Sequence, residues 1–195
     1  MLQELIETFE ELKKYVFIVN RGTQKALVIR FNNNNFYHLI GLHKTNIDMF
    51  FPNYIKSKDK KYKYIKKNIK KFDGIILNQI KEKDSLIFRI KTFHNIIDLL
   101  KSNNNTILYN LKQKVIGSMY NGDYGLMKIY EEEICCLFGL KVDNENNEFI
   151  NCAPQSWMAS NRTNRLIEGK RPIYMLNITA MPISFYNDSF NMISA

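Results

Sequence analysis

Two histidines and a lysine lie within one ten-residue segment of this chain. The segment runs from Asn35 to Lys44 and contains His38 and His43. Histidine is the side chain whose ordinary pKa lies near neutrality, so two close histidines can serve as a general acid and a general base. The alternative is structural, because on a continuous helix His43 would lie on an apolar face as a core histidine.

A helix break would decide between these interpretations. Side chains five residues apart on a continuous helix diverge by about 140°. Gly41 stands between His38 and His43, and an asparagine run at 32–35 offers N-caps for a short helix that carries His38. The two histidines can face one cleft only if this helix ends near Gly41.

Length and composition predict one intracellular domain. A chain of 195 residues, 45% hydrophobic, can bury one substantial core. We expect a single domain over 1–195, in which 53–103 is a helical, lysine-rich insertion or subdomain. No apolar run is long enough to cross a bilayer, and the N-terminus lacks the pattern of a signal peptide. A cytoplasmic protein without a membrane partner is therefore expected.

The sequence indicates neither a metal centre nor a cofactor site. Cys135 and Cys136 are adjacent and Cys152 stands alone, so we interpret all three as small buried hydrophobic residues. The phosphate-loop, dinucleotide-binding, hydrolase-elbow and zinc-protease motifs are all missing. We expect no metal and no cofactor.

The positive charge is concentrated in one segment. The net charge is +9, and residues 56–71 contain nine lysines and one aspartate. Such a cluster is typical of a surface that binds a polyanion, most often nucleic acid, and makes Lys60, Lys63 and Lys67 candidate RNA contacts. The lysines are also spaced as the solvated side of an amphipathic helix, and the two interpretations are compatible.

Hydrophobic periodicity predicts an α+β fold. The expected order is an N-terminal helix, a β-hairpin, a helical middle and a C-terminal antiparallel sheet. The predicted helices cover 2–14, the lysine-rich segment after 52–53 with an interruption at 73–74, and 84–102. The predicted strands cover 15–19, 25–31, 106–110, 115–120, 125–131, 134–142, 149–152 and 173–179. Residues 184–195 are expected to form a frayed tail.

The chemical groups that remain suit metal-independent RNA cleavage. In an internal transesterification, one group removes the 2′-hydroxyl proton and another protonates the leaving 5′-oxygen. A cation or hydroxyl stabilises the phosphorane between them. Because the RNA supplies its own nucleophile, histidines, cations and hydroxyl groups are sufficient.

The C-terminal third adds further candidates. Ser156 could hold a phosphate oxygen, Trp157 could stack on a base, and Arg165 could contact RNA. The alternatives are an ordinary turn serine and a core tryptophan.

Several segments together resemble a known family. They are Val28–Phe31, Asn35–Lys44, Asp84–Ile90 with Phe93, Pro154–Met158, and Arg165–Ile178. In this order they are similar to phage-associated nuclease-like domains of the Barnase–EndoU–colicin–RelE superfamily, which are predicted metal-independent ribonucleases. The resemblance implies a curved antiparallel sheet that bears the active site.

The same resemblance implies roles for individual residues. It makes His38 and His43 acid–base candidates and Ser156 a polar site residue. The phosphate-binding candidates that it implies are Arg30, Lys44 and Arg89.

We therefore expect a metal-independent ribonuclease-like protein of a phage or mobile element. RNA is the expected partner, and toxin, host-takeover or anti-defence biology would add a host defence protein or a cognate immunity protein. One alternative is a non-catalytic inhibitor of host defence that mimics or binds nucleic acid. A weaker alternative is a structural interaction protein.

Overall fold

The N-terminal elements form as predicted. The computed structural model describes residues 1–81, 83–102, 105–111, 122–130, 134–160 and 171–186. Helix α1 (Leu2–Leu12) buries one apolar face, because its hydrophobic residues recur at three- and four-residue steps. Strands β1 (Tyr15–Arg21) and β2 (Gln24–Arg30) then form an antiparallel hairpin.

The asparagine run caps the N-terminus of the next helix. Asn32 precedes α2 (Asn33–Leu39), and its side-chain oxygen accepts a bond from the backbone N–H of Asn34 at 3.0 Å. Asn35 Oδ1 accepts a bond from the backbone N–H of Asn32 at 2.7 Å, which completes a capping box. Asn35 Nδ2 also donates to the Pro154 carbonyl at 3.2 Å and so ties the helix to the sheet.

The helical middle is divided differently from the prediction. Two short 3-10 helices, η1 (Leu42–Lys44) and η2 (Ile47–Phe50), precede α3 (Lys58–Lys67) and α4 (Ile69–Ile80). The interruption falls at Asn68, whose side-chain amide donates to the Tyr64 carbonyl at 2.9 Å. The predicted interruption at 73–74 is wrong, since Gly74 lies inside α4.

The helix predicted over 84–102 is two helices, α5 (Asp84–Lys91) and α6 (Asn95–Lys101). Thr92 lies at the break, and its hydroxyl donates to the Phe88 carbonyl at 2.9 Å. The same hydroxyl accepts a bond from Trp157 Nε1 at 3.2 Å, so the break is fixed by a contact with the sheet.

The strands of the second half are β3 (Ile107–Asn110), β4 (Tyr124–Ile129), β5 (Cys135–Glu145), β6 (Phe149–Ser160), β7 (Arg171–Ile173) and β8 (Asn177–Pro182). The predicted strand at 115–120 lies outside the described residues. The strand predicted over 173–179 is divided between β7 and β8. Strand β6 extends eight residues further than predicted, to Ser160.

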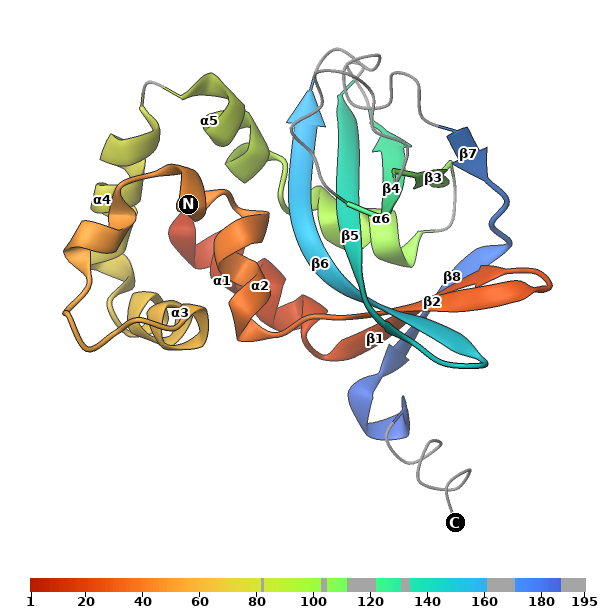
Figure 1. Cartoon of the computed structure of the whole chain (residues 1–195). Helices are drawn as coiled ribbons and strands as arrows, with labels where there is room; N and C mark the ends of the chain where they lie inside the picture. The colour runs from red at the N-terminus through yellow and green to blue at the C-terminus, as the bar shows by residue number, and fades with distance from the viewer. Residues whose placement is uncertain (82, 103–104, 112–121, 131–133, 161–170, 187–195) are drawn as a thin grey trace.

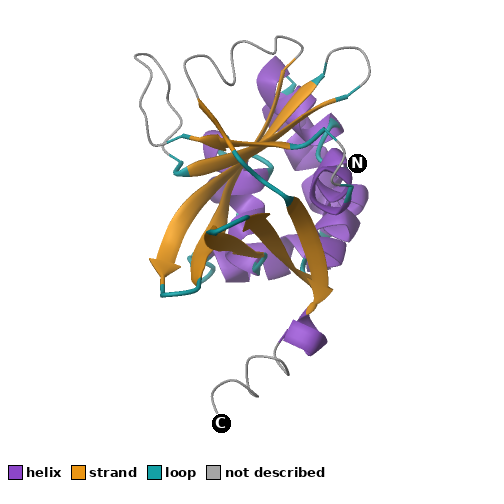
Figure 2. Ribbon diagram, turned by 90° about the vertical axis from the view of Figure 1, so that its right-hand side faces the viewer, coloured by secondary structure: helices purple, strands orange, loops and turns teal. Residues whose placement is uncertain are grey.

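All eight of these strands belong to one curled sheet, in the order β7-β3-β4-β5-β6-β2-β1-β8. Strand β2 pairs with β6 in parallel, so residues 26–29 lie beside residues 149–152 and join the hairpin to the antiparallel part. The edge strands β7 and β8 follow each other in the chain, and the sheet curls into an open half-barrel (Figures 1 and 2). The α+β class is confirmed, whereas the parallel pairing was not predicted.

One large apolar cluster joins the helices to the concave sheet. It includes Phe9 of α1, Phe72 of α4, Leu99 of α6 and Trp157 of β6, each without exposed surface. The helices from 53–103 contribute to this cluster, and their status as an insertion or subdomain stays a prediction. Across the described ranges, no helix is long and apolar enough to span a membrane.

Two smaller predictions have mixed outcomes. Cys136 and Cys152 are buried, as expected, and the Cys135 side chain lies outside the description. The prediction of a frayed tail from residue 184 is wrong for residues 184–186, which belong to a short helical turn. Tyr186 in that turn is buried against Val16 and Val28, and residues 187–195 lie outside the description.

Replacing Asn35 with alanine should destabilise the fold, because it removes the reciprocal half of the capping box and the bond to Pro154. We expect a loss of about 1–3 kcal/mol in the free energy of unfolding, measured by urea denaturation. The matched control is Asn34→Ala, which removes an exposed amide from the same turn. Equal losses in the two variants would contradict this account of the helix start.

Candidate active site

The two histidine rings lie against each other because the backbone turns at Gly41. Helix α2 ends at Leu39, and Gly41 takes a left-handed conformation with φ +80° and ψ +16°. The η1 turn then carries His43 back towards His38. The ring centroids lie 4.6 Å apart at an interplanar angle of 50°.

Glycine is required at this turn for two reasons. A positive φ costs other L-residues energy. A Cβ at position 41 would also lie 2.5 Å from Leu86 Cδ2 and 3.1 Å from Arg89 Nη1, so α5 packs directly onto the glycine. The packing of α5 on Gly41 therefore also sets where Arg89 lies beside the turn.

Arg89 places a buried positive charge beside the histidine pair. Its side chain is only 6% exposed, and Nη1 lies 3.5 Å from the His38 carbonyl oxygen. Nε is buried and has no hydrogen-bond partner among the residues that the structure describes. Burial lowers the pKa of Arg89 to about 10, which still leaves the guanidinium protonated at neutral pH.

Lys58 touches the pair from the other side and was not singled out by the sequence. Its Nζ lies 2.5 Å from His38 Nε2. Lys58 is the first residue of α3, whose N-cap Ser57 accepts a bond from the backbone N–H of Lys60 at 3.3 Å. The lysine-rich run contained the signal, but spacing within the run did not distinguish Lys58 from its neighbours.

Lys44 adds a third cation next to His43. Its side chain is exposed, and partial burial followed by the charge of Arg89 lowers its pKa. The Lys44 carbonyl accepts a bond from Lys83 Nζ at 2.7 Å, which anchors η1 to the start of α5. The predicted phosphate-binding residues Lys44 and Arg89 thus both lie at the histidine pair.

These surroundings favour the neutral form of both histidines. Burial and then the charge of Lys58 lower the pKa of His38. Burial, followed by His38, Arg89 and Lys44, lowers the pKa of His43 to about 4, although a bond to the Tyr37 backbone opposes this shift. An anion bound here would act in the opposite direction and raise both pKa values.

None of the ion pairs among the described residues involves Lys44, Lys58 or Arg89. The nearest acidic neighbour of Lys58 in sequence, Asp59, instead pairs with Lys63 at 2.8 Å. The cations around the histidines are therefore not neutralised by the carboxylates that the structure describes.

Ser156 lies on the strand that both site helices contact. It stands opposite Gly139 in the β5–β6 pairing. The flanking residues Pro154 and Trp157 bond to Asn35, one turn before His38, and to Thr92, one residue after α5. In the described part of the chain no bond joins Ser156 itself to either histidine, so its role in the site remains a proposal.

The structure separates the remaining predicted residues from the histidine pair. Trp157 is fully buried and packs edge-on against Phe93, which contradicts base stacking and supports the alternative of a core tryptophan. Arg30 lies over the ring of Tyr186 at 4.3 Å and lines a different groove. Arg165 lies outside the described residues.

Lys60, Lys63 and Lys67 are exposed on α3, as an electrostatic surface requires. Among the residues that can be described, no group of three or more His, Cys, Asp or Glu side chains gathers as metal ligands would.

Comparison with known proteins places the chain in a family. A family model described as phage-Barnase-EndoU-ColicinE5/D-RelE like nuclease4 matches residues 1–172. The chain belongs to this nuclease-like family. The match includes the histidine pair, Lys58, Arg89 and Ser156, and the family indicates a nucleic-acid substrate. No curated protein and no solved structure matches the chain.

Gly41→Ala should destabilise the protein and displace η1. The left-handed backbone alone costs about 1–2 kcal/mol, and the contact with Leu86 adds to it. The control is Gly74→Ala inside α4, where a Cβ meets nothing within 4 Å and should stabilise the helix by about 0.5–1 kcal/mol. The stability of both variants is measured by thermal unfolding. A change in the same direction in the two variants would contradict the account.

Proposed function

We propose that the protein is a metal-independent endoribonuclease that cleaves RNA by 2′-hydroxyl transesterification. The observation that carries the proposal is the contacting pair of His38 and His43, surrounded by Lys44, Lys58 and Arg89. Two groups that exchange protons near neutral pH, set among cations, match the needs of this reaction. Membership of a nuclease-like family supports the same chemistry.

A bound phosphodiester would complete the charge balance of the site. Without it, Arg89 is a buried cation whose Nε has no hydrogen-bond partner among the described residues, and burial together with neighbouring positive charge favours the neutral histidines. A phosphate stabilises these cations and favours protonation of the histidines. Substrate binding thereby brings the pKa values of the pair towards neutrality, where one ring can be protonated and the other neutral.

The environments of the rings suggest how the two roles divide. His43 is the more exposed ring and is neutral before substrate binds, so we assign it as the base that takes the 2′-hydroxyl proton. The 2′-oxygen then attacks phosphorus, and the bond from phosphorus to the 5′-oxygen breaks. His38, protonated once the phosphate is bound, gives its proton to the leaving 5′-oxygen. Burial and the charge of Lys58 favour this transfer because they lower the pKa of His38.

The cations have a separate part in this scheme. The buried charge of Arg89 lies beneath the histidines and stabilises the extra negative charge of the phosphorane. Lys44 is exposed and can contact a non-bridging oxygen directly. We retain Ser156 as a hydroxyl that positions the phosphate, since its strand is bonded to both site helices.

Helix α3 would attract the RNA to this site. Lys58 begins the helix at the histidine pair, and exposed Lys60, Lys63 and Lys67 continue along it. A protein partner, such as a host defence protein or a cognate immunity protein, belongs to the same proposal and rests on the family resemblance.

Replacing His38 or His43 with alanine should lower the rate of RNA cleavage by at least about 100-fold, because a positioned general acid or base contributes that much. The assay uses end-labelled single-stranded RNA in EDTA and scores a 2′,3′-cyclic phosphate product. His94→Ala is the matched control, because it removes an exposed histidine outside the pair.

Three results would tell against the proposal. They are full cleavage by both site variants, loss of cleavage in EDTA, and cleavage of an RNA whose 2′-hydroxyls are replaced by hydrogen. Salt-sensitive binding by the wild-type protein without any product would instead favour the non-catalytic nucleic-acid-binding inhibitor.

Removing the α3 charges should weaken RNA binding and flatten its salt dependence. In the variant Lys60→Gln/Lys63→Gln/Lys67→Gln, the magnitude of the slope of log affinity against log salt concentration should fall by up to about 2. Each lost phosphate contact removes roughly 0.7 from this slope. Lys14→Gln/Lys81→Gln/Lys91→Gln removes three exposed charges from other elements. Equal slopes for the two triple variants, measured by fluorescence anisotropy, would show that α3 has no special part.

A further inference from the structure

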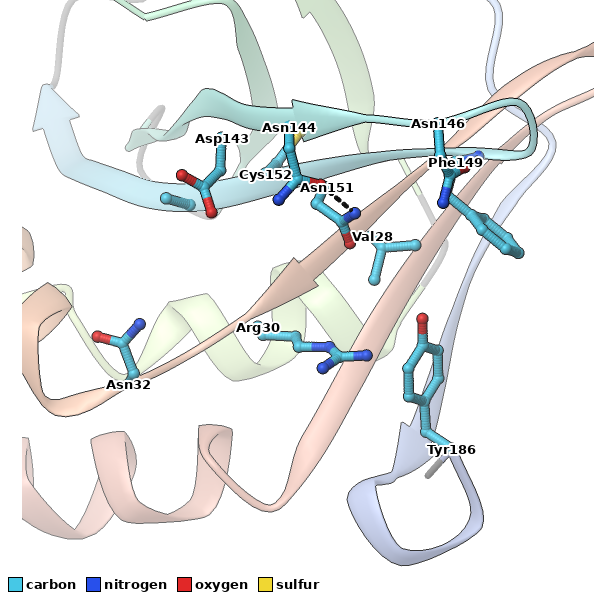
Figure 3. A pocket seen from close by; sticks show the side chains of 11 residues that line it. Val28, Arg30, Asn32, Asp143, Asn144, Asn146, Phe149, Asn151, Cys152 and Tyr186 are labelled. Atoms are coloured by element: carbon cyan, nitrogen blue, oxygen red, sulfur yellow. Dashed lines mark hydrogen bonds between the residues drawn. The ribbon is translucent and has the colours of Figure 1, made fainter. Parts of the chain in front are cut away.

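A polar groove opens between the end of β2 and the β5–β6 hairpin (Figure 3). Its volume is about 380 Å³. Asparagine amides, Arg30, the carboxylate of Asp143 and two aromatic rings line it, and neither His38 nor His43 does. Such a mixture of amides, aromatic rings and a guanidinium is typical of sites that hold the bases of single-stranded nucleic acid.

Two of the amides form a cross-strand pair that faces the groove. Asn144 of β5 lies opposite Asn151 of β6, and Asn151 Nδ2 donates to Asn144 Oδ1 at 2.6 Å (Figure 3). Each amide has a second polar atom that this bond leaves available, a donor on Asn144 and an acceptor on Asn151. Nucleobase edges carry donors and acceptors side by side and can bind both atoms at once.

Arg30 supplies a planar cation at the same groove. Its guanidinium carbon lies 4.3 Å from the ring centre of Tyr186, which is buried, and the arginine side chain is exposed. Guanidinium groups fixed in this way stack on bases and bind phosphate oxygens with two parallel bonds. This assigns the predicted phosphate-binding role of Arg30 to the groove rather than to the histidine pair.

The groove leads towards the helix that carries His38. Asn32 and Asp143 lie at one end, and Phe149 and Tyr186 at the other (Figure 3). Asn32 caps α2, and His38 follows six residues later, about 9 Å along the helix axis. About three nucleotides cover this length at the roughly 3.4 Å axial rise of one stacked strand, so one short oligonucleotide can reach from Asn32 to His38.

We propose that this groove binds a nucleobase and its phosphate from the single-stranded RNA whose backbone is cut at the histidine pair. The amides of Asn144 and Asn151 bind the base edge, and Arg30 binds the adjoining phosphate or stacks on the base. The groove thereby selects among bases, while the histidine site acts on the backbone. This inference rests on the proposed ribonuclease function for the identity of the substrate.

The test uses the full chain and the double variant Asn144→Ala/Asn151→Ala. Its matched control is Asn20→Ala/Asn177→Ala, which removes another exposed cross-strand asparagine pair, bonded at 2.6 Å between β1 and β8. Binding of 2′-deoxy-substituted A, C, G and U octamers, of an abasic octamer and of the four nucleoside monophosphates is measured by anisotropy and NMR. Cleavage of the matching RNA octamers is measured in parallel.

The groove variant should lose about 5- to 100-fold in affinity for the preferred octamer and should lose its preference among the four bases. Its affinity for the abasic octamer, and all binding by the control variant, should stay unchanged. Equal affinities in the groove variant, the control and the wild type would overturn the inference while cleavage still supports the proposed function. Groove-dependent monophosphate binding without RNA cleavage would overturn the proposed function and leave the base site standing. Absence of all binding by the wild type would overturn both.

Discussion

Gly41 holds a left-handed backbone conformation under the side chains of Leu86 and Arg89, and the geometry of the site depends on it. A helix that continued through this position would point the two histidines about 140° apart. Because the chain turns here, His43 returns to the ring of His38. The contact with α5 that excludes any larger residue also sets Arg89 beneath the pair. One backbone conformation therefore fixes the histidine pair and its buried cation.

The site is electrostatically incomplete in the free protein. Arg89 is buried, and no described carboxylate pairs with it. Lys58 approaches His38, and burial together with the neighbouring charges lowers the pKa of His43 to about 4. Buried charge is costly unless it is compensated, so this arrangement has an electrostatic cost in the free protein. Elsewhere in the described chain, lysines find acidic partners, as Lys61 does with Asp48 and Lys128 with Asp98. None of the described carboxylates pairs with the cations at the histidine pair, which supports our proposal that a phosphate binds there.

Local signals in the sequence predicted most of what positions the pair. The asparagine caps and Gly41 act within a few residues of His38, and so the break could be foreseen as the condition for a shared site. Long-range contacts could not be foreseen. The parallel pairing of β2 with β6 and the break at Thr92 both depend on segments far apart in sequence. Lys58 was hidden for a related reason, since only the fold shows which lysine of the run meets His38.

The most direct test is an NMR titration of the histidine side chains in the full chain, alone and with a 2′-deoxy-substituted RNA octamer that cannot be cut. The account predicts that both pKa values lie below the usual 6.5 in the free protein, with that of His43 the lower, near 4. Lowering the pH from 7 to 4 therefore protonates His38 before His43. Binding of the octamer should raise both values. Ordinary pKa values in the free protein, unchanged when the octamer binds, would contradict a cation-lined histidine pair built for phosphate.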